Sequence, residues 1–206
     1  MVYYANMAEH MGLNPNFSLR DHMEESQTFQ GQEKPDISIA ADKIAELIYI
    51  DPLTGCYNGN FLKNYLEKFD SRRDSNTSII FCDINNLKKT NDTEGHEAGD
   101  QLILDTVSFM EQHIRKGDLI VRPNNDKGDE LLVICKGVGV EDRDEFESLI
   151  AKRFDQQNIE RANGSRVNFA FGITHFDDTI DHGNLRETVR RADKLMYQKK
   201  VEQKAQ

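Results

Sequence analysis

The run of four apolar residues at positions 79–82, followed at once by Asp83, constrains the fold of this chain more than any other segment. A short run without polar residues is typical of a central strand that is buried on both faces. Asp83 then stands at the end of that strand, where a carboxylate is partly desolvated and its attraction to a divalent ion is less screened. The alternative is that Asp83 caps the helix that follows the strand.

The other hydrophobic patterns alternate between helical and strand spacing. We expect helices over residues 37–49, 61–69, 102–114, 146–154 and 185–196, and strands over residues 79–82, 119–121, 131–134 and 167–173. From residue 61 onward this order reads β-α-β-β-α-β with flanking helices, which predicts an α+β, ferredoxin-like fold: an antiparallel sheet backed by helices on one face. The handedness of the crossover places the first strand beside the hairpin strands.

A second pair of carboxylates, Asp129 and Glu130, stands in the bend of the predicted hairpin. The predicted fold brings this bend next to Asp83, and carboxylates in such a cluster repel one another unless a cation, protons or solvent intervene. The clustering favours a divalent metal, as in the palm of nucleotide polymerases, because metal makes phosphoryl chemistry on a charged triphosphate feasible.

The net charge and the apolar content of the chain limit the kinds of molecule that it can bind and the compartments in which we expect it. The formal net charge of −10 over 206 residues argues against a protein that binds nucleic acid polymers. No apolar run approaches the length of a membrane span, and the N-terminus lacks the pattern of a secretion signal, so we expect a soluble, cytoplasmic protein. Cys56, Cys82 and Cys135 show no metal-binding spacing and are expected to be reduced thiols of the core.

Three segments are expected along the chain. Residues 1–36 are an N-terminal extension, which is either flexible or forms a short amphipathic helix that docks on a partner. Residues 37–49 form a linker or signalling helix whose apolar positions serve either dimerisation or packing on its own domain. Residues 50–206 form the catalytic domain.

The segment from Asp83 to Asp100, with its Asn-Asp, Gly-His and Gly-Asp pairs, closely resembles the GGDEF family of diguanylate cyclases, which have a nucleotidyl-cyclase palm. Residues 51–55 (Asp-Pro-Leu-Thr-Gly) and Asn58 match the opening motif of that family. The closing helix is matched by residues 191–193 (Arg-Ala-Asp), Tyr197 and Lys200. The matches are dispersed over residues 50–200 and keep the family's order, which makes the resemblance specific.

The resemblance implies a role for each matched residue. The implied ligands of Mg²⁺ or Mn²⁺ are Asp83, the Ile84 carbonyl and Glu130. The implied catalytic residues are Asp129, Glu130 and Lys88, with Asp129 as the base for the ribose 3′-hydroxyl. The implied substrate contacts are Asn91 and Asp100 to guanine, Lys88 and Lys200 to the triphosphate, and His96 in the same pocket segment. Arg115 and Asp118 resemble the product-inhibition site, and an exposed ion pair is the alternative for them.

The implied reaction is the condensation of two GTP to cyclic di-GMP with release of pyrophosphate, and it needs two domains facing each other in a homodimer. A catalytically silent domain that binds GTP or cyclic di-GMP and signals to a partner is an alternative. A palm that makes another cyclic nucleotide is a third reading, and Asp100, which suits guanine, argues against it.

The signature itself departs from the family pattern. Lys127 replaces its first glycine, Leu131 replaces its final phenylalanine, and the stretch from Arg122 to Lys127 is longer than usual. Lys127 either obstructs guanine or adds a cation near the phosphates. Asn85 stands where the family often has a second aspartate, and Gly59 where it usually has arginine.

Overall fold

The computed structural model describes residues 45, 47–124, 128–158 and 167–204, and residues Tyr49–Gln206 form one compact unit. The strands of this unit are β1 (Tyr57–Asn58), β2 (Thr77–Ile84), β3 (Leu119–Arg122), β4 (Glu130–Lys136) and β5 (Phe169–His175). Its α-helices are α4 (Gly59–Lys68), α5 (Leu87–Glu94), α6 (His96–His113), α7 (Arg143–Phe154), α8 (Asp178–Asp181) and α9 (Leu185–Lys204), with short 3₁₀ turns η2 (Val140–Asp142) and η3 (Asp155–Asn158).

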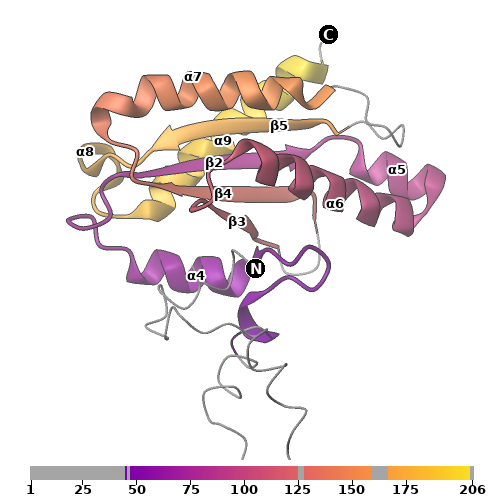
Figure 1. Cartoon of the computed structure of the whole chain (residues 1–206), viewed down its shortest axis with the longest axis horizontal. Coiled ribbons are helices and arrows are strands. Elements are labelled where there is room, and N and C mark those ends of the chain that lie inside the picture. Colours follow the sequence, from indigo (N-terminus) through magenta and orange to yellow (C-terminus); the bar gives the residue numbers. More distant parts are fainter. Residues whose placement is uncertain (1–44, 46, 125–127, 159–166, 205–206) are drawn as a thin grey trace, which may run out of the picture. The chain divides into compact units, whose positions relative to one another are not determined.

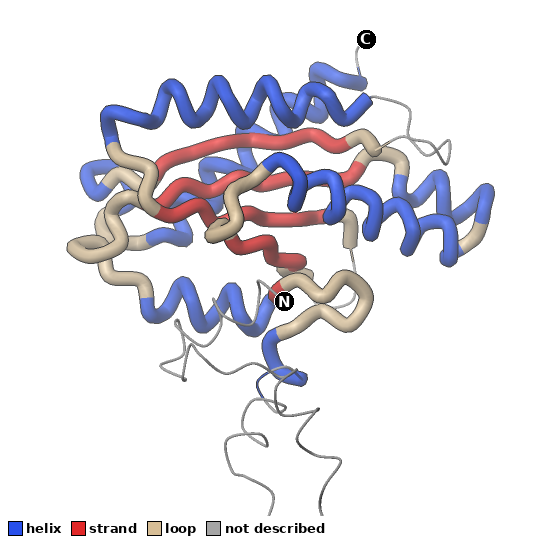
Figure 2. Tube along the Cα trace, in the orientation of Figure 1, coloured by secondary structure: helices blue, strands red, loops and turns tan. Residues whose placement is uncertain are grey.

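A single five-stranded sheet in the order β1-β3-β4-β2-β5 forms the centre of the unit (Figure 2). Strand β2 pairs antiparallel with both β4 and β5, and β3 and β4 form the predicted hairpin. The order of helices and strands is therefore confirmed. The antiparallel pairing expected for the core strands is confirmed, and β1, which the sequence did not predict, adds a fifth strand that pairs parallel to β3; a strand of two residues carries no periodicity that a sequence could reveal.

Helices cover both faces of the sheet, as Figure 1 shows with α6 in front of it and α9 behind it. A Cβ atom on Gly172 of β5 would lie 2.2 Å from the Ala192 carbonyl oxygen, so α9 packs directly on that face of the strand. On the opposite face, the Phe154 ring of α7 lies 5.3 Å from the rings of Phe169 and Phe171. The two helices of the predicted core, α6 and α7, therefore lie on one face of the sheet, as expected, and the flanking helix α9 covers the other face. The burial of all eight β2 residues fits a strand covered on both sides.

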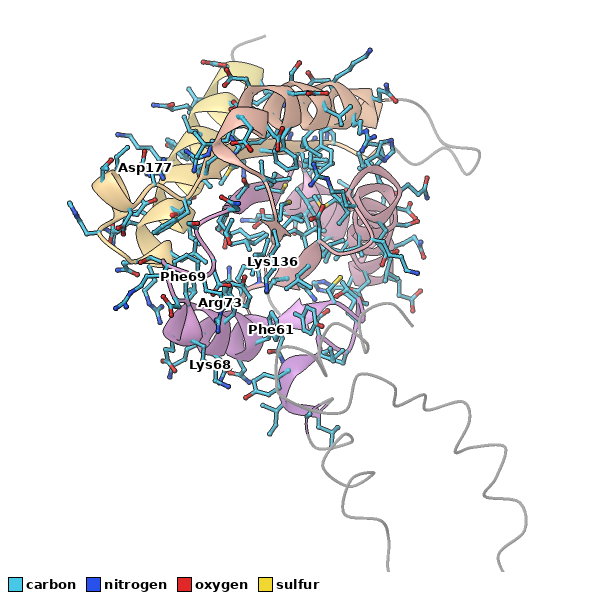
Figure 3. The ribbon with its side chains drawn as sticks, turned by 60° about the vertical axis from the view of Figure 1, so that its left-hand side comes forward. Phe61, Lys68, Phe69, Arg73, Lys136 and Asp177 are labelled. Carbon is cyan, nitrogen blue, oxygen red and sulfur yellow. The ribbon has the colours of Figure 1, made fainter. Side chains whose placement is uncertain are left out.

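Helix α4 closes the β1 edge of the sheet. The Asn58 side chain accepts a hydrogen bond from the Phe61 backbone N–H at 3.2 Å and so caps the helix. The Phe61 ring stacks on Tyr57 of β1 with the centroids 3.8 Å apart, and Phe69, just after the helix, meets Phe176 edge-on at 4.9 Å. Figure 3 shows Phe61 and Phe69 at the two ends of α4. Aromatic contacts thus fix this helix at both ends.

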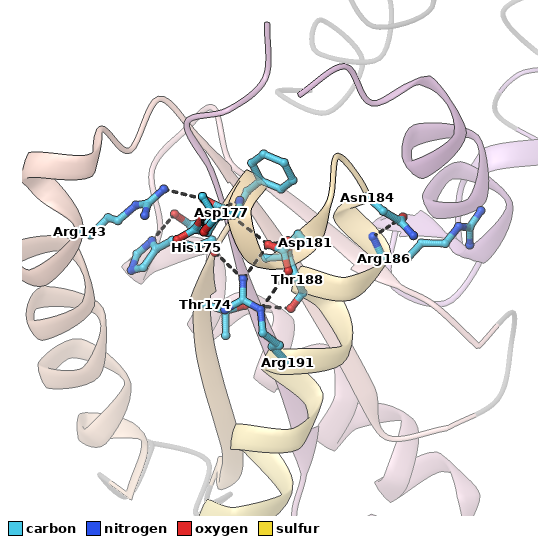
Figure 4. Close-up of polar contacts among 12 residues, drawn as sticks. Arg143, Thr174, His175, Asp177, Asp181, Asn184, Arg186, Thr188 and Arg191 are labelled. Atoms are coloured by element: carbon cyan, nitrogen blue, oxygen red, sulfur yellow. Dashed lines mark hydrogen bonds and ion pairs between the residues drawn. The ribbon is translucent and has the colours of Figure 1, made fainter. Parts of the chain in front are cut away.

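A buried polar cluster ties α9 to the end of β5 (Figure 4). The Asp181 carboxylate accepts hydrogen bonds from Arg191 Nη2 and Thr188 Oγ1, both at 2.7 Å, and Arg191 Nη2 also donates to the His175 carbonyl oxygen at 2.7 Å. Burial opposes the charge on Asp181, but these hydrogen bonds hold its pKa below the usual value. His175 lies on the β5 segment that pairs with the start of β2, so the cluster is at the opposite end of the sheet from Asp83.

The first predicted segments fall largely outside the described residues. The extension at 1–36 is not among them, and of the expected helix at 37–49 only residues 45 and 47–49 are described, all of them helical. The three cysteines are all buried in the core, as predicted. Among the described residues, no helix is both long enough and apolar enough to span a membrane.

Candidate active site

The carboxylates that the sequence singles out meet at the ends of two adjacent strands. Asp83 of β2 lies directly opposite Glu130 of β4 in the antiparallel register, and the Ile84 N–H donates to the Asp129 carbonyl oxygen at 2.7 Å. Asp83 is buried inside β2 rather than at the start of a helix, because the cap of α5 is Asn86 in a left-handed conformation. The capping alternative for Asp83 is therefore wrong, and the predicted juxtaposition with the hairpin bend is confirmed.

Negative charge from β2, from α9 and from the turn before β4 surrounds Glu130. Burial raises the pKa of its carboxyl group, and the neighbouring Asp129, Asp193 and Asp83 raise it further. One hydrogen bond opposes these effects: Asn124 Nδ2 donates to Glu130 Oε2 at 2.6 Å. A cation at this position would relieve the repulsion and favour the ionised form. Asn124 is a contact of the site that the sequence did not reveal.

A lysine reaches the same cluster from α9. Lys200 Nζ forms a hydrogen-bonded ion pair with Asp83 Oδ1, and both side chains are largely buried, at 21% and 11% exposed. Partial burial reduces the screening of this pair by solvent. Lys200, predicted from the resemblance as a triphosphate contact, thus lies next to the predicted metal ligands.

The residues present suit a divalent metal that is shared with a nucleotide. Among the described residues, no group of three or more histidine, cysteine or acidic side chains is placed so that it could hold a metal ion by itself. Mg²⁺ in phosphoryl-transfer sites normally needs only one or two carboxylates, with phosphate and water oxygens completing the shell. Asp83 and Glu130, which face each other across β2 and β4, are two carboxylates of this kind; the Ile84 carbonyl stays a predicted third ligand.

Apart from Lys200, the predicted guanine and phosphate contacts lie on the helical pair that follows β2. Lys88 and Asn91 belong to α5, whereas His96 and Asp100 belong to the first turns of α6, and all but the half-buried Asn91 are exposed. A Cβ atom on Gly99 of α6 would lie 1.8 Å from Asn91 Oδ1. Gly99 thus leaves the space in which the Asn91 side chain sits, a role that the sequence indicated only through its Gly-Asp pair.

A buried ion pair anchors the turn that carries the signature. Arg122 Nη1 lies 3.3 Å from Asp51 Oδ2, and Arg122 Nη2 donates to the Gly128 carbonyl oxygen at 3.3 Å. The Thr54 N–H and hydroxyl also donate to Asp51 Oδ1, at 2.9 and 2.6 Å. The opening motif therefore supports the signature turn through Arg122, which sequence reasoning missed. Lys127 lies outside the described residues; Gly128, at a φ of +105°, adopts a conformation that favours glycine.

The predicted product-inhibition pair is not an exposed ion pair. The buried Asp118 carboxylate accepts the Arg115 backbone N–H at 2.9 Å, and burial raises the pKa of that carboxyl group. The exposed Arg115 guanidinium lies over the Phe146 ring, 5.3 Å from its centroid. Asp118 stabilises the turn before β3, and Arg115 remains accessible from solvent.

Comparison with known proteins agrees with this geometry. The family model "Diguanylate cyclase, GGDEF domain" matches residues 48–206, and the chain therefore belongs to the GGDEF family.

The chain is 30% identical over 159 residues to the probable diguanylate cyclase DgcT of Escherichia coli strain K12, covering 73% of this chain and 33% of DgcT. The crystal structure of a diguanylate cyclase/phosphodiesterase from Caldicellulosiruptor saccharolyticus is 25% identical, with a TM-score of 0.60 over 77% of this chain and 91% of that one. The coiled coil and GGDEF domain of Caulobacter crescentus DgcB shares the fold, with a TM-score of 0.66 at 16% identity over 89% of this chain and 92% of that one. The chain spans only 26% and 33% of the length of two curated relatives, Bacillus subtilis YtrP and DgcT.

Proposed function

We propose that this chain is a diguanylate cyclase, which condenses two GTP molecules to cyclic di-GMP and releases pyrophosphate. The observation that carries the proposal is the direct pairing of Asp83 with Glu130, with Asp129 beside them. Structural packing alone does not require three carboxylates at one end of a sheet. The family relatives named as diguanylate cyclases support the same reaction.

In the proposed reaction, the 3′-oxygen of one GTP forms a bond to the α-phosphorus of the other, and the bond from that phosphorus to the bridging oxygen of pyrophosphate breaks. Asp129 accepts the proton of the 3′-hydroxyl. Asp83, Glu130 and the Ile84 carbonyl would hold Mg²⁺ or Mn²⁺, which would supply charge neutralisation for the triphosphate. A second, equivalent step closes the ring.

The remaining site residues position the substrate. The Asp100 carboxylate accepts hydrogen bonds from guanine N–H groups and the Asn91 amide donates and accepts at the guanine edge, and such paired contacts reject bases that lack the matching groups. Lys88 and Lys200 contact phosphate oxygens. His96 belongs to the same pocket. Because each domain holds one GTP in this proposal, the active form is a homodimer in which two sites face each other.

The direct test is to incubate the purified chain with GTP and Mg²⁺ and to identify the product by mass spectrometry. We expect cyclic di-GMP and pyrophosphate, with a rate per protomer that rises with protein concentration as dimers form. Absence of the product at high protein concentration would contradict the proposal. ATP in place of GTP is the matched control for base selection.

A silent GGDEF domain that binds GTP or cyclic di-GMP is the second candidate. It is favoured by the Asn124 amide, which already bonds to a Glu130 oxygen that the metal would need, in a signature turn altered at Lys127. Calorimetric titration distinguishes the two candidates, because the silent domain binds a guanine nucleotide without turning it over.

A further inference from the structure

The proposed metal site and an ion pair share one carboxylate. Asp83 is the proposed metal ligand on β2, yet its Oδ1 atom already bonds to Lys200 Nζ from α9. An ammonium group and a divalent ion that share a carboxylate repel each other and divide its charge. Full coordination of a metal by Asp83 therefore requires that Lys200 give up this contact or share it.

A second connection holds Lys200 in place. Asn85, two residues after Asp83, donates from Nδ2 to Gln203 Oε1 at 3.0 Å and to Asn168 Oδ1 at 2.6 Å. Gln203 lies on α9 three residues after Lys200, which is one turn of the helix. The end of β2 and the end of α9 are thus joined by two side-chain contacts, and Asn85 sets the position from which Lys200 reaches Asp83.

The neighbouring lysine is engaged elsewhere. Lys199 Nζ lies 3.4 Å from Asp155 Oδ1 and 3.5 Å from the centroid of the Phe171 ring. It carries the same charge on the same helix turn, but its contacts lie away from the carboxylate cluster. Lys199 therefore provides a matched control for Lys200.

We propose that Lys200 is an exchangeable counter-ion that couples metal binding to triphosphate binding, an inference that rests on the proposed function. Without a nucleotide, the Lys200 ammonium lowers the affinity of Asp83 for a divalent ion. A triphosphate offers several anionic oxygens to the same ammonium, and the flexible lysine side chain can turn to them. The carboxylate is then released to the metal, so metal and nucleotide bind together. Asn85 is a positioning residue for this exchange.

The test uses the full chain and two separate titrations. In the first, Mn²⁺ alone is titrated into wild type, Lys200→Gln and Lys199→Gln. In the second, the α,β-methylene analogue of GTP is titrated into the same proteins in the presence of EDTA. We expect Lys200→Gln to bind Mn²⁺ about fivefold more tightly than wild type and the analogue about fivefold more weakly, the lower end of ordinary couplings between sites. Lys199→Gln should match wild type in both titrations.

Opposite shifts of the two affinities cannot come from simple damage to the fold, which would weaken both. Mn²⁺ binding by Lys200→Gln that is unchanged, weaker or undetectable would overturn the proposal, and so would unchanged binding of the analogue. Lys200→Met, with circular dichroism as a check of folding, repeats the test with another side chain. Asn85→Ala should tighten Mn²⁺ binding in the same direction, and an unchanged affinity would remove Asn85 from the proposal.

The two titrations are measured separately from the formation of cyclic di-GMP, so failure of the coupling and failure of the proposed cyclase can be told apart. An inactive chain with the opposite shifts would refute the cyclase and keep the coupling. An active cyclase in which Lys200→Gln leaves the Mn²⁺ affinity unchanged would refute the coupling alone.

Discussion

Replacement of Arg122 by methionine tests the anchor beneath the signature turn. Asp51 is fully buried and Arg122 is 5% exposed, so the substitution leaves a carboxylate in the interior without its counter-charge. Breaking a buried pair in this way costs about 3–5 kcal/mol. Asp51 keeps two hydrogen bonds from Thr54, and its distances to Arg122 are long, which places the expected loss at the lower end, about 3 kcal/mol.

The assay is urea unfolding of the whole chain followed by circular dichroism, with thermal unfolding as a second measure. For a domain of this size, a loss of about 3 kcal/mol corresponds to a fall in Tm of about 6–12 °C. Arg190→Met is the matched control, because its ion pair with Glu187 is exposed; we expect less than about 0.5 kcal/mol there.

A double variant separates the effect of the unpaired Asp51 charge from the effect of the lost arginine side chain. Adding Asp51→Asn to Arg122→Met removes the buried charge and should recover part of the lost stability. If Arg122→Met lowers the free energy of unfolding by less than about 1 kcal/mol, the reasoning is refuted, because an ion pair whose loss has so small an effect does not anchor the turn.

Three further predictions concern single residues. Glu130→Gln should leave the unfolding transition nearly unchanged and abolish metal-dependent turnover; unchanged product formation would exclude Glu130 as a ligand. Gly99→Ala should raise the KM for GTP up to about tenfold by displacing the Asn91 side chain, without lowering stability, since alanine favours helix; an unchanged KM would separate Asn91 from guanine.

The third prediction concerns the dependence of stability on pH. Burial, together with Arg143 and Arg191, lowers the pKa of His175 to about 4, while the exposed Glu147, 3.7 Å from Nε2, is screened by solvent. As the pH falls, His175 takes up a proton in the unfolded chain before it does so in the folded chain. The free energy of unfolding should therefore be full above about pH 6.5 and fall by about 2–3 kcal/mol towards pH 4. Urea unfolding at several pH values checks this, and His175→Gln should flatten the dependence; an equal slope in that variant would refute it.

The sequence predicted those features of the fold that leave a clear pattern of apolar residues. The apolar run at 79–82 identified β2, and the order of elements placed Asp83 beside Glu130. Helix α5 escaped prediction because its eight residues include a single apolar side chain, Leu87, and so show no helical period. Although the helix was not predicted, the resemblance to the GGDEF family identified two of its residues, Lys88 and Asn91, as substrate contacts.

The missed parts of the site are contacts between residues that are distant in the chain. Arg122 and Asp51 are 71 residues apart, and neither has a local pattern that predicts the other. Asn124 lies in an irregular turn, and its bond to Glu130 depends on the path of that turn. Asn85 was noted only as a departure from the family, whereas its contacts with Asn168 and Gln203 exist only once β5 and α9 are in place.

The central position of β2 has a consequence for the order of folding. Strands β3 and β4 are consecutive in the chain and form a local hairpin, whereas β2 pairs with β4 and β5, which both follow much later in the sequence. Closing those long loops carries an entropic cost before any pairing compensates for it. We expect the hairpin to be structured in the folding transition state, so that substitutions in it change the folding rate almost as much as the stability (kinetic φ-values near one). The pairing of β2 with β5 should form afterwards. The carboxylate cluster would then be assembled late, so that slow steps in refolding report on the site itself.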